Sequence, residues 1–452
     1  MREDANHTSR GMATFFTVWA GQFISVIGSN LTMFALGVWV YEQSEAVTPY
    51  ALVWLAASLP QVLLAPVAGA LVDRWDRRWV MILSDCGAGL STLAIALLLF
   101  AGDLSTGPIY AAVLIAALFS VFQWPAYSAA TTLLVPKEHY ARASGMVEMA
   151  QGIGMLVAPL IAGLLMKLAG LKLVLLIDFT TFAFAVGTLL VVRFPQPTAS
   201  AEGEKARKSL WRELIFGWSY VAARRGLLAL LVLFAVNNLF TGIATAVVVP
   251  MLLAFTSEAT LGTVMTLGSS GAIVGSIVIG VWGGPQRRVR GVMGFGVLFG
   301  LGMMLMGLRP SAVLITLALG LMMGCMPIIS ACSQAIWQSK VEPDVQGRVF
   351  AVRSMISSAS LPVAYLVAGP LADVVFEPLL VDGGVLADSV GRVIGVGAGR
   401  GIGLLLMCMG AFLVASLGLA YLYPRLRLVE DELPDCVGAE LVMGDAVPVT
   451  AG

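Results

Sequence analysis

Long apolar segments alternate with short polar ones along most of the 452-residue chain. An α-helix rises 1.5 Å per residue, so about 20 apolar residues cross the roughly 30 Å hydrocarbon core of a bilayer. Twelve segments are of this kind. We predict membrane-spanning helices at residues 14–40, 49–72, 79–101, 107–134, 144–168, 172–193, 226–254, 259–282, 291–308, 311–338, 347–374 and 400–423.

The loops between these segments differ in charge, which orients the chain. Lys and Arg favour the cytoplasmic side of a membrane, and an even number of spans puts both chain ends on one side. With both termini in the cytoplasm, only five of the 27 basic residues lie outside, namely Lys167, Lys172, Arg309, Arg392 and Arg400. We therefore expect cytoplasmic termini.

Composition sets the class of protein. Hydrophobic residues make up 58% of the chain and charged residues 12%, with a mean hydropathy of +0.90, against about 25% charged residues in soluble domains. This is the composition of a polytopic protein embedded in a lipid bilayer. The 27 basic and 27 acidic residues give a formal net charge of zero, so no nucleic-acid partner is expected.

Enzyme chemistry finds little support in the sequence. The two histidines, His7 and His139, fall in the N-terminal segment and a loop, and no nucleophile elbow, Walker loop or metal-ligand spacing is present. We expect a protein that is not an enzyme and has no cofactor or metal.

A polar segment divides the chain into two halves. Residues 195–208 are too polar to enter lipid or form a core, and apolar residues at helical spacing follow from Leu210 to Val221. They predict a helix lying in the membrane interface or, alternatively, a cytoplasmic extension of the seventh span. The predicted divisions are a cytoplasmic N-terminus (1–13), a first bundle (14–193), a linker (194–225), a second bundle (226–423) and a cytoplasmic tail (424–452).

The loop after the second span, residues 69–78, carries five charges between two apolar segments. It resembles the loop signature of the major facilitator superfamily, Gly-x-Leu-x-Asp-Arg-x-Gly-Arg-Arg/Lys. Asp76 stands where the family usually has Gly, and the matching positions are Gly69, Leu71, Asp73, Arg74, Arg77 and Arg78. The bland alternative is an ordinary cytoplasmic turn held inside by its arginines.

The two halves also repeat each other. Residues 135–142 and 341–348 align at an offset of 206, and the loop at 283–290 stands where a second copy of the signature belongs but lacks its Asp. The implied fold is an all-α membrane protein with twelve helices in two pseudo-symmetric six-helix bundles.

Segments 122–131, 333–340 and 346–353 are similar to the bacterial branch of the superfamily that contains macrolide efflux proteins and the enterobactin exporter. This resemblance implies a multi-pass protein of the bacterial cytoplasmic membrane, working as a monomer, that exports a small amphipathic molecule in exchange for protons. The alternatives are a facilitator or importer of the same fold without proton coupling, and a membrane sensor or scaffold that transports nothing.

The fifth span resembles the glycine-rich motif of antiporters in this superfamily, with Ala158 replacing a Gly. Small residues let helix backbones approach closely, and a proline bends the helix. Gly154, Pro159 and Gly163 are therefore predicted to form a pivot surface. Alternatively, such faces occur in many membrane helices that never move.

The pseudo-symmetry also predicts a latch for the outward-open state. Asp73 should lie near the start of the eleventh span, where a helix dipole and Arg348 or Arg353 favour an anion. The opposite loop would offer Arg287 or Arg288 to Glu148. The predicted latch comprises Gly69, Asp73, Arg74, Arg77, Arg78, Arg348 and Arg353.

Few ionisable groups fall inside the spans, where each is costly. Asp85, Asp178 and Glu148 are the candidates for proton coupling. The superfamily resemblance places spans three and six behind the cavity, so Asp85 and Asp178 are interpreted first as structural groups. Glu148, near the inner end of span five, stands closer to the interface.

The resemblance places spans one, four, seven and ten around the cavity, and their polar residues fall on helical faces. The predicted substrate-binding residues are Gln22, Ser25, Ser29, Gln123, Trp124, Tyr127, Asn238, Thr241, Ser330 and Gln334. Hydrogen bonding within each bundle is the competing explanation. Because none of the four spans carries a mid-membrane carboxylate, we expect a charge-free wall and a neutral, zwitterionic or bulky amphipathic substrate, such as a macrolide, peptide or siderophore-like molecule.

Overall fold

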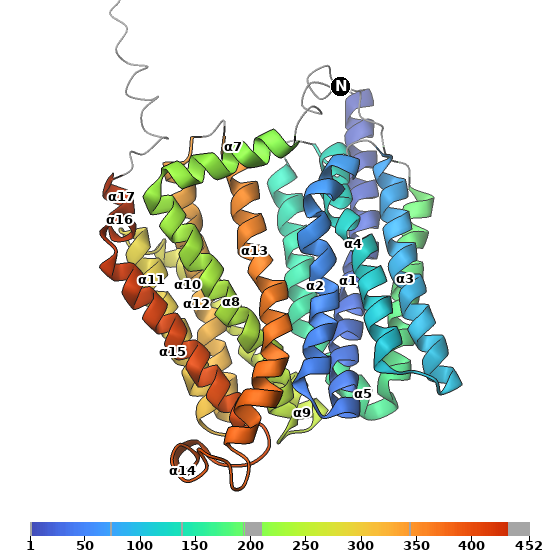
Figure 1. The fold of residues 1–452 in the computed structure, drawn as a ribbon. Coiled ribbons are helices and arrows are strands. Elements are labelled where there is room, and N and C mark those ends of the chain that lie inside the picture. Colours follow the sequence, from blue (N-terminus) through green and yellow to red (C-terminus); the bar gives the residue numbers. More distant parts are fainter. Residues whose placement is uncertain are drawn as a thin grey trace, which may run out of the picture.

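The fold is a bundle of long helices joined by turns and short loops (Figure 1). It is a computed structural model that describes residues 2–72, 75–136, 139–192, 194, 210–342 and 345–432. No strand occurs in these ranges.

The long helices of the first half follow the predicted spans. They are α1 (Arg2–Ser44), α2 (Val47–Val72), α3 (Arg77–Ala101), α4 (Thr106–Leu134) and α5 (Tyr140–Val191). The helix α1 begins well ahead of the predicted start at residue 14, because the polar N-terminal residues continue the same helix.

The second half repeats this pattern. Its helices of more than ten residues are α7 (Leu210–Ala223), α8 (Arg225–Leu253), α9 (Glu258–Ser269), α10 (Gly271–Trp282), α11 (Arg288–Leu308), α12 (Ala312–Lys340), α13 (Gln346–Pro370) and α15 (Arg400–Leu422). Short elements follow α13 and α15, namely η2 (Leu371–Phe376), η3 (Glu377–Leu379), α14 (Gly391–Ile394), α16 (Pro424–Arg427) and α17 (Val429–Glu432).

Eleven helical segments of the described chain are long and apolar enough to cross a membrane, with α9 and α10 together forming one of them. The segment in α5, Arg142–Val191, has 50 residues and would be about 75 Å long, more than twice the thickness of the hydrocarbon core. The backbone of Gly170 leaves helical geometry at φ 66° and ψ −170°, a conformation open to glycine. This break lies between predicted spans five and six; the count of twelve stays a prediction.

The two ends of the bundle differ. The N-terminus and α7 lie at one end, here called the linker face, and α14 lies at the opposite end, here called the loop face (Figure 1). The helix α7 extends across the linker face, and the chain turns at Arg224 (φ −106°, ψ 89°) before α8 begins. It is therefore a separate helix and not an extension of the seventh span.

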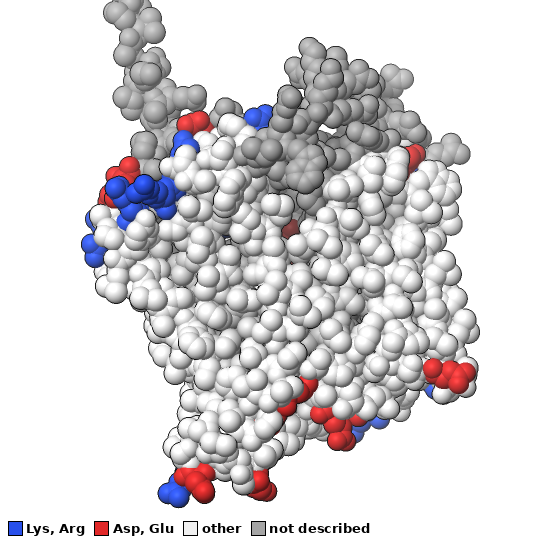
Figure 2. Space-filling view, viewed as in Figure 1, with Lys and Arg blue, Asp and Glu red and all other residues white. Residues whose placement is uncertain are grey.

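The surface between the two faces is apolar. Figure 2 shows Lys, Arg, Asp and Glu gathered toward the ends of the visible face, with a broad and nearly uncharged band between them. Large apolar side chains of the long helices, such as Leu63, Leu90 and Val281, are exposed. A surface of this kind is stable against lipid chains, since lipid imposes no cost for exposing apolar groups.

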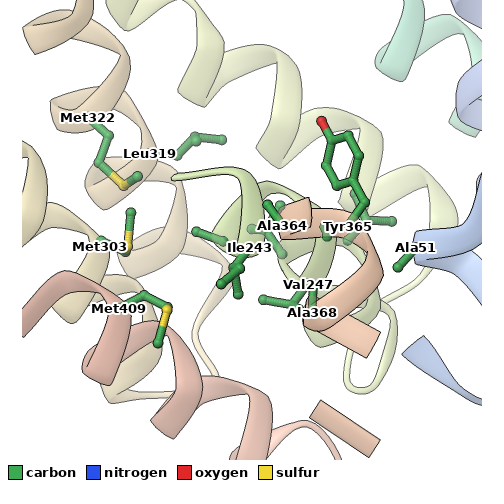
Figure 3. Packing of buried hydrophobic residues seen from close by; sticks show 14 of the residues in the cluster. Ala51, Ile243, Val247, Met303, Leu319, Met322, Ala364, Tyr365, Ala368 and Met409 are labelled. Carbon is green, nitrogen blue, oxygen red and sulfur yellow. The ribbon is translucent and has the colours of Figure 1, made fainter. Parts of the chain in front are cut away.

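Inside the molecule, apolar packing continues from the first half into the second. Ala51 on α2 lies close to Tyr365 and Ala368 on α13, and Val247 on α8 lies beyond them (Figure 3). All four residues are at most 8% exposed. The helices α2, α5, α8, α9 and α13 thus form the seam between the halves. The domain boundaries stay a prediction.

Candidate functional site

A cavity of about 450 Å³ opens in the second half. Its wall is amphipathic and combines aromatic and aliphatic groups, such as Phe234 and Met326, with amide and hydroxyl groups. The polar residues of the wall are Asn237, Asn238, Thr241, Ser330, Gln334, Arg353, Ser354 and Ser357. They come from α8, α12 and α13, and all but Thr241 lie in the halves of these helices nearer the linker face. Four of the predicted substrate-binding residues are among them: Asn238, Thr241, Ser330 and Gln334.

The wall of this cavity is charged, which corrects the expectation of a charge-free wall. The Arg353 guanidinium donates from Nη1 to Gln334 Oε1 at 2.9 Å and from Nη2 to Ser333 Oγ at 3.2 Å. It also lies 5.2 Å from the ring centroid of Trp337, at cation–π distance. Sequence reasoning assigned Arg353 to the latch because it considered only spans one, four, seven and ten as the cavity wall.

The predicted polar residues of the first half lie in a different network. Gln22 donates to Asp85 Oδ2 at 2.8 Å, and Gln123 donates to Asp85 Oδ1 at 3.0 Å and to Gln22 Oε1 at 2.8 Å. Asp85 is 4% exposed. Gln22 and Gln123 therefore link α1, α3 and α4 through a buried carboxylate. This is hydrogen bonding within a bundle, the alternative to substrate binding for these two residues.

The other predicted residues of the first half are scattered. Ser25 and Tyr127 are buried, Ser29 is half-buried, and Trp124 is 46% exposed. None of these four lines the cavity of the second half.

The remaining two candidates for proton coupling differ in environment. Asp178 is 1% exposed, and its Oδ2 accepts a hydrogen bond from Thr92 Oγ1 at 3.0 Å. Glu148 lies exposed near the start of α5. Asp85 and Asp178 are thus both held within the first half by neutral amide or hydroxyl donors.

The loop between α2 and α3 is described only in part. Asp73 and Arg74 lie outside the described residues, and Gly69 is described only as a helical position of α2. Asp76, the departure from the family pattern, is the N-cap of α3 and accepts from the backbone amides of Arg78 at 2.9 Å and Trp79 at 3.4 Å. A carboxylate in this position satisfies free amides and favours the helix dipole.

Arg77 and Arg78, the described arginines of this loop, tie it to neighbouring helices. Arg77 Nη1 donates to Ala129 O at 3.3 Å, and Arg78 donates to Leu189 O at 2.7 Å and Leu190 O at 2.8 Å. The latter carbonyls belong to the last turn of α5, where a cation is favourable.

Arg348, also assigned to the latch, lies 5.5 Å from the ring centroid of Phe216 on α7.

The corresponding loop of the second half obtains its acid from the C-terminal segment. Glu430 accepts from the backbone amides of Arg288 and Val289, both at 3.0 Å, and so caps α11. Arg287 pairs with Asp431 at 3.5 Å. In this conformation the partner of Arg287 is thus Asp431, and the suggested pairing of Arg287 or Arg288 with Glu148 stays a prediction. Nothing in the sequence pointed to this cap, because Glu430 is 142 residues from Arg288.

The predicted pivot residues occupy two different contacts. Gly163 on α5 faces α9, since an added Cβ would come within 2.5 Å of Glu258 O, and Gly262 on α9 packs on the backbone of Pro159. Thr266 Oγ1 also donates to Leu156 O at 3.0 Å across this contact. Gly154, in contrast, faces Val26 on α1 within the first half.

The second contact of the seam joins α2 to the end of α13. Asp373 in η2 accepts from the backbone amides of Val47 at 2.8 Å and Thr48 at 2.7 Å, and from Thr48 Oγ1 at 2.6 Å. It therefore caps α2 from the other half of the molecule. Sequence reasoning missed Asp373, and its place at the end of an apolar span was the only signal.

These seam contacts share a position in the bundle. Thr48 is at the start of α2, Glu258 is at the start of α9, and Asp373 follows α13, all near the loop face. The cavity lies in the opposite half, nearer the linker face. The halves of the molecule are thus held together by backbone contacts and carboxylate hydrogen bonds at the loop face.

Several known transporters are similar to this chain. Macrolide efflux protein A of Streptococcus pyogenes is 26% identical over 367 residues, covering 79% of this chain and 89% of that protein. The multidrug efflux pump Tap of Mycolicibacterium fortuitum is 24% identical over 358 residues, covering 76% and 86%.

Solved structures agree in fold. A bacterial homologue of the human lysosomal transporter Spinster, in an inward-facing and unoccupied conformation, gives a TM-score of 0.71 at 13% identity, covering 94% of this chain and 98% of that one. A mutant of the nucleoside transporter NupG gives 0.73 at 11% identity, covering 90% and 100%.

The expected all-α membrane fold is confirmed, and the relatives are transporters, not enzymes. The bacterial efflux proteins among the relatives, together with the many apolar helices of this chain, indicate a multi-pass protein of the bacterial cell membrane. The family model of the Major Facilitator Superfamily matches residues 18–365. The chain belongs to the Major Facilitator Superfamily.

Proposed function

We propose that the protein exports a small amphipathic molecule from the bacterial cytoplasm in exchange for protons, by alternating access between two six-helix bundles. Relatives named macrolide efflux protein and multidrug efflux pump support export. In this proposal the protein works as a monomer and the linker face is cytoplasmic, as the distribution of Lys and Arg favours.

The observation that carries the proposal is that the seam contacts and the cavity lie toward opposite ends of the bundle. The contacts of Thr48 with Asp373 and of Gly163 with α9 lie near the loop face, while the amphipathic cavity lies nearer the linker face. A transporter closed at the outer side presents its binding site to the cytoplasm. Both contacts involve small groups and hydrogen bonds, which separate and re-form at modest cost.

For proton exchange, we propose Asp85 as the first carboxylate to test. Its two oxygens accept hydrogen bonds from Gln22 and Gln123, which are neutral donors on α1 and α4. Protonation of a buried carboxylate held by neutral amides breaks no ion pair, and the amides can turn to meet the new hydroxyl group. Asp178 has similar donors but lies farther along the bundle toward the loop face, between α3 and α5.

The test is transport of a macrolide, erythromycin, in proteoliposomes with and without an imposed pH gradient. We expect flux to follow the gradient in the wild type and to lose that dependence in Asp85→Asn, which keeps the size of the side chain. Asp103→Asn, in the exposed turn after α3, is the matched control. Flux that ignores the gradient in the wild type would instead support an uncoupled facilitator, and no flux at all would count against export of macrolides.

A further inference from the structure

We infer that the cavity of the second half recognises an anionic group on its substrate, a carboxylate on an otherwise apolar molecule, through the guanidinium of Arg353. This inference rests on the proposed function, since it narrows the class of molecule that the transporter carries.

The charge of Arg353 is not neutralised within the described part of the chain. Its contacts there are the side-chain oxygens of Gln334 and Ser333 and the ring of Trp337, all of which are neutral. No Asp or Glu is among the described residues that line the cavity. Arg353 is half-buried; a partly desolvated cation without a counter-ion is unfavourable, and an anionic ligand offsets that cost.

The guanidinium is also held in a fixed position. Ser333 is fully buried and Trp337 is 1% exposed, so two of the three groups that contact Arg353 cannot move easily. Within the described ranges it donates two hydrogen bonds, to Gln334 and Ser333, whereas the group carries five N–H donors. The remaining donors are available for a carboxylate, which a guanidinium binds in a bidentate manner.

The rest of the cavity suits the apolar part of such a molecule. Phe234, Phe299, Met326 and Ile329 supply aromatic and aliphatic surface. Asn238 is already engaged, because it donates to Ser357 O at 3.1 Å. Arg353 is therefore the strongest polar determinant of the wall.

A structural role for Arg353, joining α13 to α12, predicts something different. In that case removing the guanidinium would lower stability but would not change which ligands bind. Recognition of an anion predicts a change in selectivity between two ligands that differ only in charge.

The test uses N-dansyl-phenylalanine and its carboxamide, which differ in one ionised group, binding to the purified protein in detergent without a gradient. Charge-assisted hydrogen bonds predict at least about tenfold tighter binding of the acid by the wild type. The ratio should fall to about one in Arg353→Gln, while Arg353→Lys should retain part of it.

A second variant keeps Arg353 in place. Gln334→Glu puts a carboxylate beside the guanidinium with almost no change in shape, so it should also abolish the preference for the acid. The control is Arg392→Gln, because Arg392 is exposed in α14 at the loop face. It should retain the wild-type ratio.

Equal binding of the two probes to the wild type would overturn the inference. So would an acid preference that survives in both Arg353→Gln and Gln334→Glu, and so would a failure of both probes to bind. The proposed function is judged separately, because erythromycin flux driven by a pH gradient is measured in another assay and can persist when this binding test fails.

Discussion

Alanine at position 163 should open the loop face of the transporter. An added Cβ would lie 2.5 Å from Glu258 O, whereas non-bonded contacts of this kind are stable near 3.5 Å. The obstructing atom belongs to the backbone of α9, so α5 and α9 must separate by about 1 Å. Overpacking of this kind costs about 1–3 kcal/mol, which changes a two-state ratio by about 5- to 150-fold.

Spin labels at Asp103 and Asp382, both exposed in turns at the loop face, report this change as a distance distribution. The labels are placed in a variant whose native cysteines have been replaced. We expect Gly163→Ala to shift the distribution toward longer distances, because the conformation with α5 and α9 in contact becomes less stable.

The matched control is Gly152→Ala on the same helix, where an added Cβ meets no atom within 4 Å. Both variants gain the same helix propensity, roughly 1 kcal/mol, so any difference between them reports the contact with α9. Indistinguishable distance distributions for the two variants would refute the reasoning.

Two further predictions follow from the carboxylates that cap helices. Asp373→Asn should increase the population with long label distances, because an amide accepts fewer of the three hydrogen bonds from α2 and the loss is about 1–3 kcal/mol; an unchanged distribution would contradict this. Glu430→Gln should lower the free energy of unfolding by about 1–2 kcal/mol, because it weakens the cap of α11. Glu432→Gln, which removes an exposed pair with Arg425, should change it by less than about 0.5 kcal/mol, and an equal loss in both would show that the cap contributes nothing.

Sequence alone predicts the spans well because bilayer thickness dictates their length. Even the break in α5 at Gly170 falls between the predicted end of span five at residue 168 and the predicted start of span six at residue 172. The length of an apolar segment is a local property, and the physical requirement behind it applies to each segment separately.

The site is harder to predict, because a polar stripe does not say which neighbouring helix it faces. Asn238 and Gln334 lie in the cavity wall, whereas Gln22 and Gln123, with similar spacing, bind Asp85. The difference is decided by helix packing and not by periodicity. Arg353 was assigned to the latch for the same reason.

Long-range caps lie beyond sequence reasoning altogether. Asp373 is 325 residues from Thr48, and Glu430 is 142 residues from Arg288. Asp373 stands at the end of a span and Glu430 beyond one, and only the fold brings each to the amides of a distant helix. The second loop lacks its own acid and obtains one in this way.

A reversible cross-link at the loop face tests alternating access most directly. Thr48 Oγ1 and Asp373 Oδ2 are 2.6 Å apart, so Thr48→Cys with Asp373→Cys places two thiols within reach of each other. We predict that oxidation abolishes transport in proteoliposomes of whichever of erythromycin and N-dansyl-phenylalanine the wild type carries, and that reduction restores it, while each single variant transports under both conditions. Full transport by the cross-linked protein would contradict the account, because it would show that the protein transports without separating its two halves at this face.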